Sequence, residues 1–268
     1  MIDCDTSSRT SHSRPAIGAI GRWIIAIALL ATVAITGGFL AMLVNDAWRL
    51  VRTSQCSSDQ FAVVTYMHSY YDKYGHLPPA YVADPDGKRI HSWRILLAEH
   101  GNLRFPVQYD FNKPWDHGNN QRVADYRPIM YACPSDPVTQ KNNRLTNYFV
   151  ITGSNTPFPG SRTVPLPRSA GGRGSSNTIL LVESINRNIE WLEPRDLPFH
   201  AMSFTPNDPR RPSISSHHPG GPLVTMADGS RRSVKGIDPD VLRAMIEYVP
   251  DPSNEHELRS SPRPVPRS

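Results

Sequence analysis

A run of about 22 residues without charge, Trp23 to Val44, limits what this chain can become more than any other feature. The run reads WIIAIALLATVAITGGFLAMLV and contains no Asp, Glu, Lys or Arg. A helix of this length spans about 30 Å, which is the thickness of the hydrocarbon core of a bilayer. Trp23 and Trp48 lie near its two ends, where amphipathic rings favour the membrane interface. We therefore predict a transmembrane helix over residues 22–45, with the lipid bilayer as a partner of residues 23–44.

Two other interpretations of the run are weaker. A core helix rarely stays uncharged for so long. A cleaved signal peptide would have a shorter apolar run, and no small-x-small site with a polar break follows this one. Arginines lie on both sides of the run, with a slight excess before it that points the amino terminus inward. We expect a single-pass protein of the inner membrane, with its carboxy-terminal domain in the periplasm or outside the cell.

The remaining sequence is rich in proline and predicts a loop-rich α+β domain. The chain has 26 Pro and 17 Gly among 268 residues, a composition that disfavours a helix bundle. We predict a disordered segment over residues 1–21, the membrane helix, an α+β domain over 46–249 and a disordered tail over 250–268. The net charge is +5, but no basic stripe with interleaved aromatic residues occurs, so we expect no nucleic-acid partner.

Three segments of the domain carry clear secondary-structure patterns. The stretch SSDQFAVVTYMHSYYDKYG predicts a helix that ends at Gly75, and no Pro or Gly lies between Phe39 and Gly75 that would separate it from the membrane helix. NTILLVES predicts a strand covered on both faces. DPDVLRAMIEYV predicts a helix capped by Asp238. The apolar face of the first helix is predicted from residues at helical spacing: Phe61, Val64, Tyr71 and Tyr74.

Two cysteines, Cys56 and Cys133, follow the membrane run, and Cys4 precedes it. In an oxidising compartment Cys56 and Cys133 could form one disulfide. Two free thiols remain the other interpretation. No CxxC pair occurs, so a zinc ribbon is not supported.

The stretch SSHHPGGPLVTMADGS, residues 215–230, combines histidines, glycines and an aspartate. Asp228-Gly229 predicts a two-residue hairpin of type I′, in which both central residues have positive φ. We expect the hydrogen bonds of His218 to hold the glycine-rich loop, which is a structural role. A metal site would need a third ligand, for which Glu183, Glu193 and His200 have no supporting spacing. We therefore expect no metal, no cofactor and no catalytic residue.

A hydrolase or carbohydrate-binding module is the alternative function, and a metal sensor that binds zinc through His218 is a third interpretation. Several acids fall within ESINRNIEWLEPRD, and a pair of carboxylates can hydrolyse glycosides. Acids at a solvated strand end are the simpler interpretation. Tryptophans in loops could bind sugars, although they more often fill a small core. The residues concerned are Glu183, Glu190, Glu193 and Asp196, and Trp93, Trp115 and Trp191.

The chain resembles a bacterial family of unknown function, abundant in planctomycetes, that carries a motif labelled prepilin-type H-x9-D-G. His218, nine residues and then Asp228-Gly229 fit this motif. Further blocks of the family occur in order: SYYDKYGHLPPAYV (69–82), HSWRILL (91–97), NKPWD (112–116), CPSDP (133–137), TNYFVITG (146–153), SSNTILLVES (175–184) and WLEPRDL (191–197). The resemblance covers roughly residues 56–248.

The resemblance implies a type IV pilin-like fold, with a long amino-terminal helix packed on a small antiparallel sheet. It implies a non-enzymatic, membrane-anchored pilin-like or pseudopilin-like envelope protein, with an interaction or secretion role and other envelope proteins as partners. His218, Asp228 and Gly229 would then be structural. The chain departs from the family at GAIGRWIIAIALLA, which lacks the phenylalanine after the glycine and the glutamate of a prepilin peptidase site. This departure puts cleavage and filament assembly in question.

Overall fold

The structure is a computed structural model that describes residues 18–166 and 174–248. The chain divides into two compact units, Met1–Trp48 and Arg49–Ser268. Most of the predicted disordered segment 1–21 and all of the predicted tail 250–268 fall on residues 1–17 and 249–268, outside the described residues. Helix α1 begins at Ala19, so the predicted disorder is wrong for residues 19–21.

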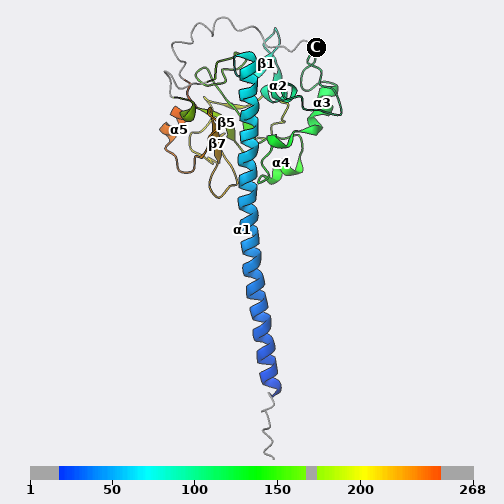
Figure 1. Cartoon of the computed structure of the whole chain (residues 1–268), viewed down its shortest axis with the longest axis vertical. Coiled ribbons are helices and arrows are strands. Elements are labelled where there is room, and N and C mark those ends of the chain that lie inside the picture. The colour runs from blue at the N-terminus through cyan, green and yellow to red at the C-terminus, as the bar shows by residue number, and fades with distance from the viewer. Residues whose placement is uncertain (1–17, 167–173, 249–268) are drawn as a thin grey trace, which may run out of the picture. The chain divides into compact units, whose positions relative to one another are not determined.

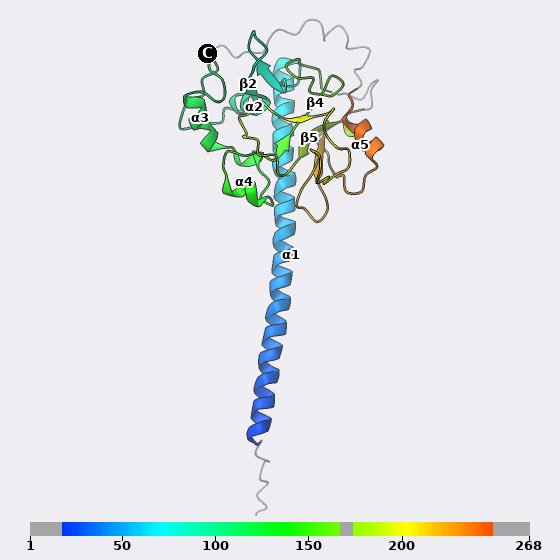
Figure 2. The same ribbon diagram turned by 180° about the vertical axis from the view of Figure 1, so that it is seen from behind.

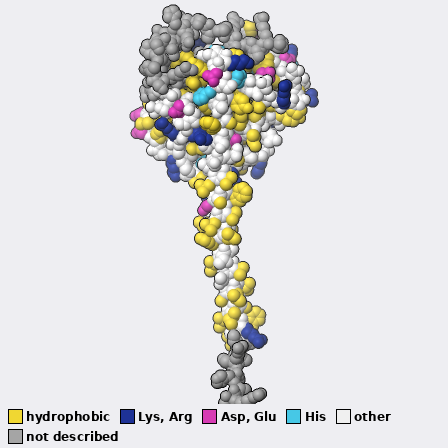
Figure 3. Space-filling view, in the orientation of Figure 1, with side chains coloured by type: hydrophobic (Ala, Val, Ile, Leu, Met, Phe, Trp, Pro, Cys, Tyr) yellow, Lys and Arg dark blue, Asp and Glu magenta, His cyan; other side chains and the backbone are white. Residues whose placement is uncertain are grey.

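Helix α1 (Ala19–Tyr74) is a single helix of 56 residues, as the lack of Pro and Gly after Gly38 predicts. It ends where Gly75 adopts a φ of 76°. Its first part is apolar and exposed all round, and it is long and apolar enough to cross a membrane. Hydrophobic side chains cover the visible face of this part (Figure 3). The hydroxyl groups of Thr32 and Thr36 donate to carbonyl groups one turn earlier, so neither hydroxyl is left without a partner.

From Cys56 onward, α1 is amphipathic. The positions that are buried follow the three- and four-residue spacing of one helix face: Cys56, Asp59, Gln60, Val63, Val64, Met67 and Tyr70. The predicted face is wrong in three of its four members, since Phe61 and Tyr74 are exposed and Tyr71 is half-buried. Aromatic residues on this helix lie at the rim of the contact, where a large ring can cover apolar surface and still meet water.

The main sheet has four antiparallel strands in the order β3 (Tyr148–Phe149), β5 (Ile179–Glu183), β7 (Leu223–Met226) and β8 (Arg231–Ser233). All five residues of β5 are buried, as its continuous apolar run predicts. Polar contacts join the sheet to α1: Thr225 of β7 donates to the side chain of Gln60, and Tyr148 donates to the carbonyl oxygen of Cys56.

Short elements complete the second unit. β1 (Tyr81–Ala83) and β2 (Arg89–Ser92) form an antiparallel hairpin, and β4 (Ile151–Thr152) pairs in parallel with β6 (Leu197–Pro198). The helices are α2 (Trp93–His100), α3 (Asn119–Val123), α4 (Pro137–Lys141) and α5 (Pro239–Ile246), together with 3-10 turns at Ala124–Tyr126, Ile129–Tyr131 and Ser175–Asn177. Asp238 caps α5 as predicted, accepting hydrogen bonds from the amides of Asp240 and Val241.

Within the second unit, the carboxy-terminal part of α1 runs between two groups of elements. Figure 1 shows α2, α3 and α4 on one side of it and β5, β7 and α5 on the other, and the view from behind agrees (Figure 2). The protein therefore combines a long apolar helix with a mixed α+β domain whose sheets are small and mainly antiparallel.

A buried ion pair joins α2 to the segment before β6. Arg94 Nη2 lies 2.6 Å from Asp196 Oδ1, and the two side chains are 0% and 1% exposed. The same carboxyl oxygen accepts from the indole of Trp93 and from the amide of Val150. Burial raises the pKa of Asp196, and the Arg94 charge opposes that rise. Asp196 is thus part of the core, and its assignment to a solvated strand end is wrong.

Candidate functional site

The Asp-Gly turn between β7 and β8 forms the predicted hairpin, but with a different turn. Gly229 has a φ of 82°, whereas Asp228 does not have a positive φ. The amide of Gly229 donates to Met226, and the amide of Met226 donates to Ser230, which is a type I turn followed by a glycine bulge. Asp228 is exposed, and its Oδ1 accepts from the amide of Ser230. The type I′ prediction is therefore wrong, while the need for glycine at position 229 remains.

His218 lies in the loop before β7 and is buried, with 5% of its surface exposed. Its Nδ1 is 3.0 Å from the hydroxyl oxygen of Thr53 on α1. Because that hydroxyl already donates its single hydrogen to the carbonyl oxygen of Arg49, it accepts a hydrogen bond from His218. Nδ1 therefore carries the proton, and Nε2 presents a lone pair on the opposite side of the ring.

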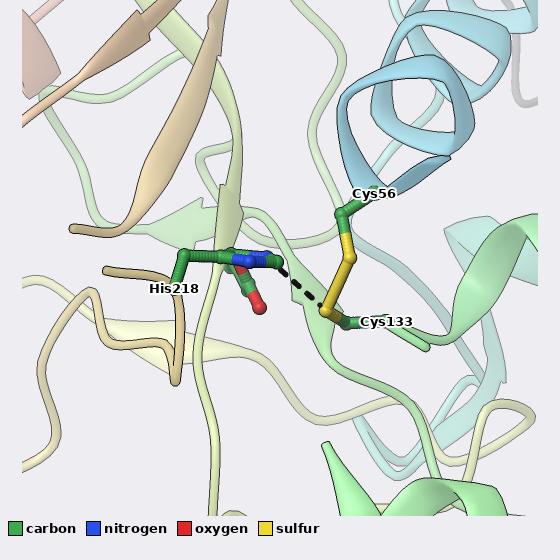
Figure 4. A group of neighbouring side chains, drawn as sticks. Cys56, Cys133 and His218 are labelled. Atoms are coloured by element: carbon green, nitrogen blue, oxygen red, sulfur yellow. Dashed lines mark hydrogen bonds and ion pairs between the residues drawn. A yellow bond between two sulfur atoms is a disulfide. The ribbon is translucent and has the colours of Figure 1, made fainter. Parts of the chain in front are cut away.

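The Nε2 atom of His218 faces a disulfide. The structure joins Cys56 of α1 to Cys133 of the loop after the 3-10 turn Ile129–Tyr131, with Cα atoms 5.2 Å apart. Nε2 lies 3.3 Å from Cys133 Sγ, and Figure 4 shows the ring pointing at that sulfur atom. Both cysteines are fully buried. The two cysteines and His218 thus meet from three segments that are far apart in the sequence.

Glu183, the last residue of β5, completes this cluster. Its Oε2 lies 3.5 Å from Nε2 of His218, and its side chain is 0% exposed. Neither carboxyl oxygen has a partner among the described residues at normal hydrogen-bond geometry, although the backbone of Leu223 lies near enough to act on its pKa. Burial raises the pKa of Glu183 well above its usual range, the charge of nearby Asp136 raises it further, and a backbone hydrogen bond from Leu223 opposes the rise. The ligand-type atoms of Cys56, Cys133, Glu183 and His218 all lie within 4.8 Å of one another.

Burial lowers the pKa of His218, and the neighbouring charge of His217 lowers it further. Burial therefore favours the uncharged forms of both His218 and Glu183, so their contact does not behave as a salt bridge. The protonated carboxyl group of Glu183 can donate only a long hydrogen bond, at 3.5 Å, to the Nε2 lone pair, and a carboxyl group so weakly satisfied in the core costs free energy. Such a group in a native fold calls for a specific explanation. The sequence offered Glu183 only as one of three candidate third ligands, without a spacing that supported it.

The other predicted site residues lie apart from this cluster. Glu193 accepts from the amide of Glu190 and pairs with Arg195, and His200 is exposed. The favoured interpretation, in which tryptophans fill the core, is confirmed for Trp93 and Trp191, which are fully buried, while Trp115 is half-buried. The hydrolase alternative would need Glu183, Glu193 and His218 in one open pocket. Glu183 and His218 are in contact, but both side chains are buried in the core.

A pocket of about 370 Å³ lies beside this cluster, because its lining includes Ser184, which follows Glu183, and Ser216, which accepts from the amide of His218. Three arginines, Arg187, Arg210 and Arg211, line it together with Asp208, Ile185 and serine, asparagine and proline residues from the segments 184–187 and 207–216. Its lining does not include Glu183, Glu193 or His218. The pocket therefore gives the acidic residues of the hydrolase interpretation no substrate-binding surface.

Comparison with known proteins finds one similarity. Residues 51–173 match the model of a family described as a protein of unknown function, DUF1559. The matched segment contains Cys56 and Cys133, and it ends before Glu183 and His218. Searches of curated proteins and of solved structures found no match.

Proposed function

We propose that this protein is a non-enzymatic, membrane-anchored envelope protein with a pilin-like design. The observation that carries the proposal is helix α1, one continuous helix whose first part is apolar and exposed and whose second part forms one face of a domain core. Exposing an apolar helix of this length to water is unfavourable in free energy, whereas the same helix is stable in a bilayer. The match to a family of unknown function, which begins at residue 51, agrees with a distinct domain after the anchor.

The proposed orientation places the carboxy-terminal domain outside the inner membrane. The Cys56–Cys133 disulfide supports it, because disulfides persist in the periplasm and outside the cell and are rare in the cytosol. The proposed partners are the lipid bilayer and other envelope proteins, within a secretion or pilus-like apparatus. The missing phenylalanine and glutamate of the peptidase site favour a protein that is anchored without joining a filament.

Fractionation of cells that express the full chain tests the anchor. The protein should stay in the membrane pellet after extraction at alkaline pH, whereas a chain that begins at Arg49 behind a cleavable secretion signal should be released. Protease added to spheroplasts should digest the domain of the full chain. A full chain recovered in the soluble fraction without extraction would exclude the anchor, and protection from protease would exclude the orientation.

A glycan array probed with the purified full chain in detergent separates the two functions. The proposed function expects no glycan binding and no release of sugar. Reproducible binding to one class of glycan, lost on substitution of residues in the arginine-lined pocket, would favour the carbohydrate-binding alternative.

A further inference from the structure

The cluster around Glu183 contains two metal-ligand groups, a carboxyl group and an imidazole, that a structural disulfide does not require. A disulfide and a histidine can pack in an apolar core, but a fully buried carboxyl group with no hydrogen bond of normal geometry destabilises the fold. Replacing it with an apolar residue of similar size would remove that cost. Its position against two cysteine sulfurs and an imidazole nitrogen points to a state in which the carboxylate has a partner.

We propose that Cys56, Cys133, Glu183 and His218 bind one zinc ion when the two cysteines are thiols, so that the disulfide and the zinc ion are alternative occupants of the same place. Two sulfurs, one imidazole nitrogen and one carboxylate oxygen form a four-ligand set of the kind that zinc accepts. The proposal does not depend on membrane anchoring.

The distances agree with a tetrahedral ion. With ligand bonds of about 2.0–2.3 Å, neighbouring ligand atoms of a tetrahedral zinc site lie roughly 3.3–3.8 Å apart. His218 Nε2 is 3.3 Å from Cys133 Sγ and 3.5 Å from Glu183 Oε2. The two Cα atoms of the cysteines are 5.2 Å apart, a spacing from which rotation about the Cα–Cβ bonds can separate the sulfurs once their bond is broken.

The hydrogen bond to Thr53 prepares His218 for this role. Metal-binding histidines commonly donate their second ring N–H to a protein acceptor, which fixes both the tautomer and the ring orientation. Here the Thr53 hydroxyl accepts from Nδ1, and the Nε2 lone pair faces the two sulfurs and the carboxyl group. The histidine would therefore need no rearrangement to become a ligand.

The change of state balances as a two-electron reduction followed by ion binding. A dithiol reductant gives two electrons and two protons to the Cys56–Cys133 bond, which becomes two thiols while the reductant becomes a disulfide. Zinc then displaces the two thiol protons, and any proton on Glu183, into solvent. Oxidation reverses the sequence, expels zinc and restores the disulfide.

Zinc content of the full chain in detergent tests the proposal. In a Cys4→Ser background, which leaves only the two cysteines of the cluster, the chain is reduced with a phosphine under argon, equilibrated with zinc and desalted. We expect one zinc per reduced chain and none per oxidised chain. Cobalt in place of zinc should give a thiolate-to-metal absorption band. A reduced chain that retains its near-ultraviolet circular dichroism but binds no zinc would overturn the proposal.

Single substitutions distinguish the proposed zinc ligands from residues that only lie near them. Glu183→Gln and His218→Ala should each weaken zinc binding at least tenfold, whereas His217→Ala, at an exposed neighbour, should not change it. If reduced variants unfold, the rate of reoxidation gives an independent measure in the Cys4→Ser chain. Zinc should slow disulfide formation at least tenfold, and this protection should be lost in Glu183→Gln. Equal rates with and without zinc, or equal affinity of all variants, would contradict the proposal.

Discussion

The carboxyl group of Glu183 lies 3.5 Å from the imidazole of His218, and both side chains are within 1% of complete burial. In the oxidised protein no described residue gives this carboxyl group a hydrogen bond of normal geometry. A buried carboxyl group of this kind lowers the stability of the fold. Functional sites are where the rule that buried polar groups have hydrogen-bond partners is most often broken.

The first prediction is that Glu183→Met stabilises the oxidised protein. The substitution conserves volume and removes a buried polar group without a partner, which should raise the free energy of unfolding by about 1–3 kcal/mol. Glu99→Met, at an exposed position of α2, is the matched control and should change it by less than about 0.5 kcal/mol. Denaturant unfolding at neutral pH measures both. Destabilisation of the Glu183 variant would mean that the carboxyl group has a partner in the oxidised state.

The second prediction concerns pH and Asp59 of α1. Burial raises the pKa of Asp59 to about 6, and a hydrogen bond from Gln55 opposes the rise. Because the folded protein holds this proton more tightly than the unfolded chain, the stabilisation is present below about pH 4 and is lost as the pH rises to about 6.

Asp59→Asn should remove this contribution to the pH dependence. With allowance for partial solvent screening, the difference in the free energy of unfolding between wild type and variant should change by roughly 1–2 kcal/mol between about pH 4 and about pH 6. Asp86→Asn, in the exposed turn after β1, should leave the pH profile unchanged. Parallel profiles of wild type and Asp59→Asn would contradict the prediction.

The third prediction concerns the covalent link. The Cys56–Cys133 bond closes a loop with a sequence separation of 77, for which the chain-entropy treatment gives about 4 kcal/mol. The double variant Cys56→Ala/Cys133→Ala should lose stability of this order in metal-free buffer, and reduction should no longer affect it. Cys4→Ala is the control and should unfold like wild type. A loss below about 1 kcal/mol would show that the denatured chain is already compact around this loop.

The fourth prediction compares a buried ion pair with an exposed one. Asp196→Ala leaves the buried Arg94 guanidinium without its counter-charge and should cost about 3–5 kcal/mol. Glu247→Ala breaks the pair with Arg243 in α5, whose side chains are 32% and 54% exposed, and should cost less than about 1 kcal/mol. Thermal unfolding of the two variants gives the comparison, and similar losses would contradict it.

The fifth prediction tests the bilayer as the solvent of α1. Arginine at Leu30 and Val33, near the middle of the apolar run, should cost about 2.5–3.5 kcal/mol per residue for insertion and release the chain on alkaline extraction. Val138→Arg and Val241→Arg, at exposed positions of the second unit, add the same charge and should not change the extraction. Equal retention of both double variants would exclude a spanning helix.

Features that depend on neighbouring residues could be predicted from the sequence. The absence of Pro and Gly after Gly38 predicts one continuous helix, the run before Glu183 predicts a strand buried on both faces, and Asp238 before Pro239 predicts the start of α5. Each of these depends on backbone geometry or on the local balance of apolar and charged residues.

Features that depend on contacts between distant segments could not be predicted. The buried face of α1 is chosen by the sheet that covers it, so Met67 lies inside and Phe61 outside. The turn at Gly229 is set by the pairing of β7 with β8. Glu183 joins Cys56, Cys133 and His218 only because four segments meet, and a carboxylate at the end of a strand carries no sign of this in the sequence.

The position of Cys56 on α1 has a mechanical consequence. A pulling force that enters the second unit at Arg49 travels along the helix for about two turns before it reaches the sulfur bridge. There the load passes into a covalent bond that leads to the loop at Cys133. The remainder of α1, from Ser57 to Tyr74, therefore carries less of the force and stays packed on the sheet. An anchored protein of this design would resist extension for as long as the disulfide is intact.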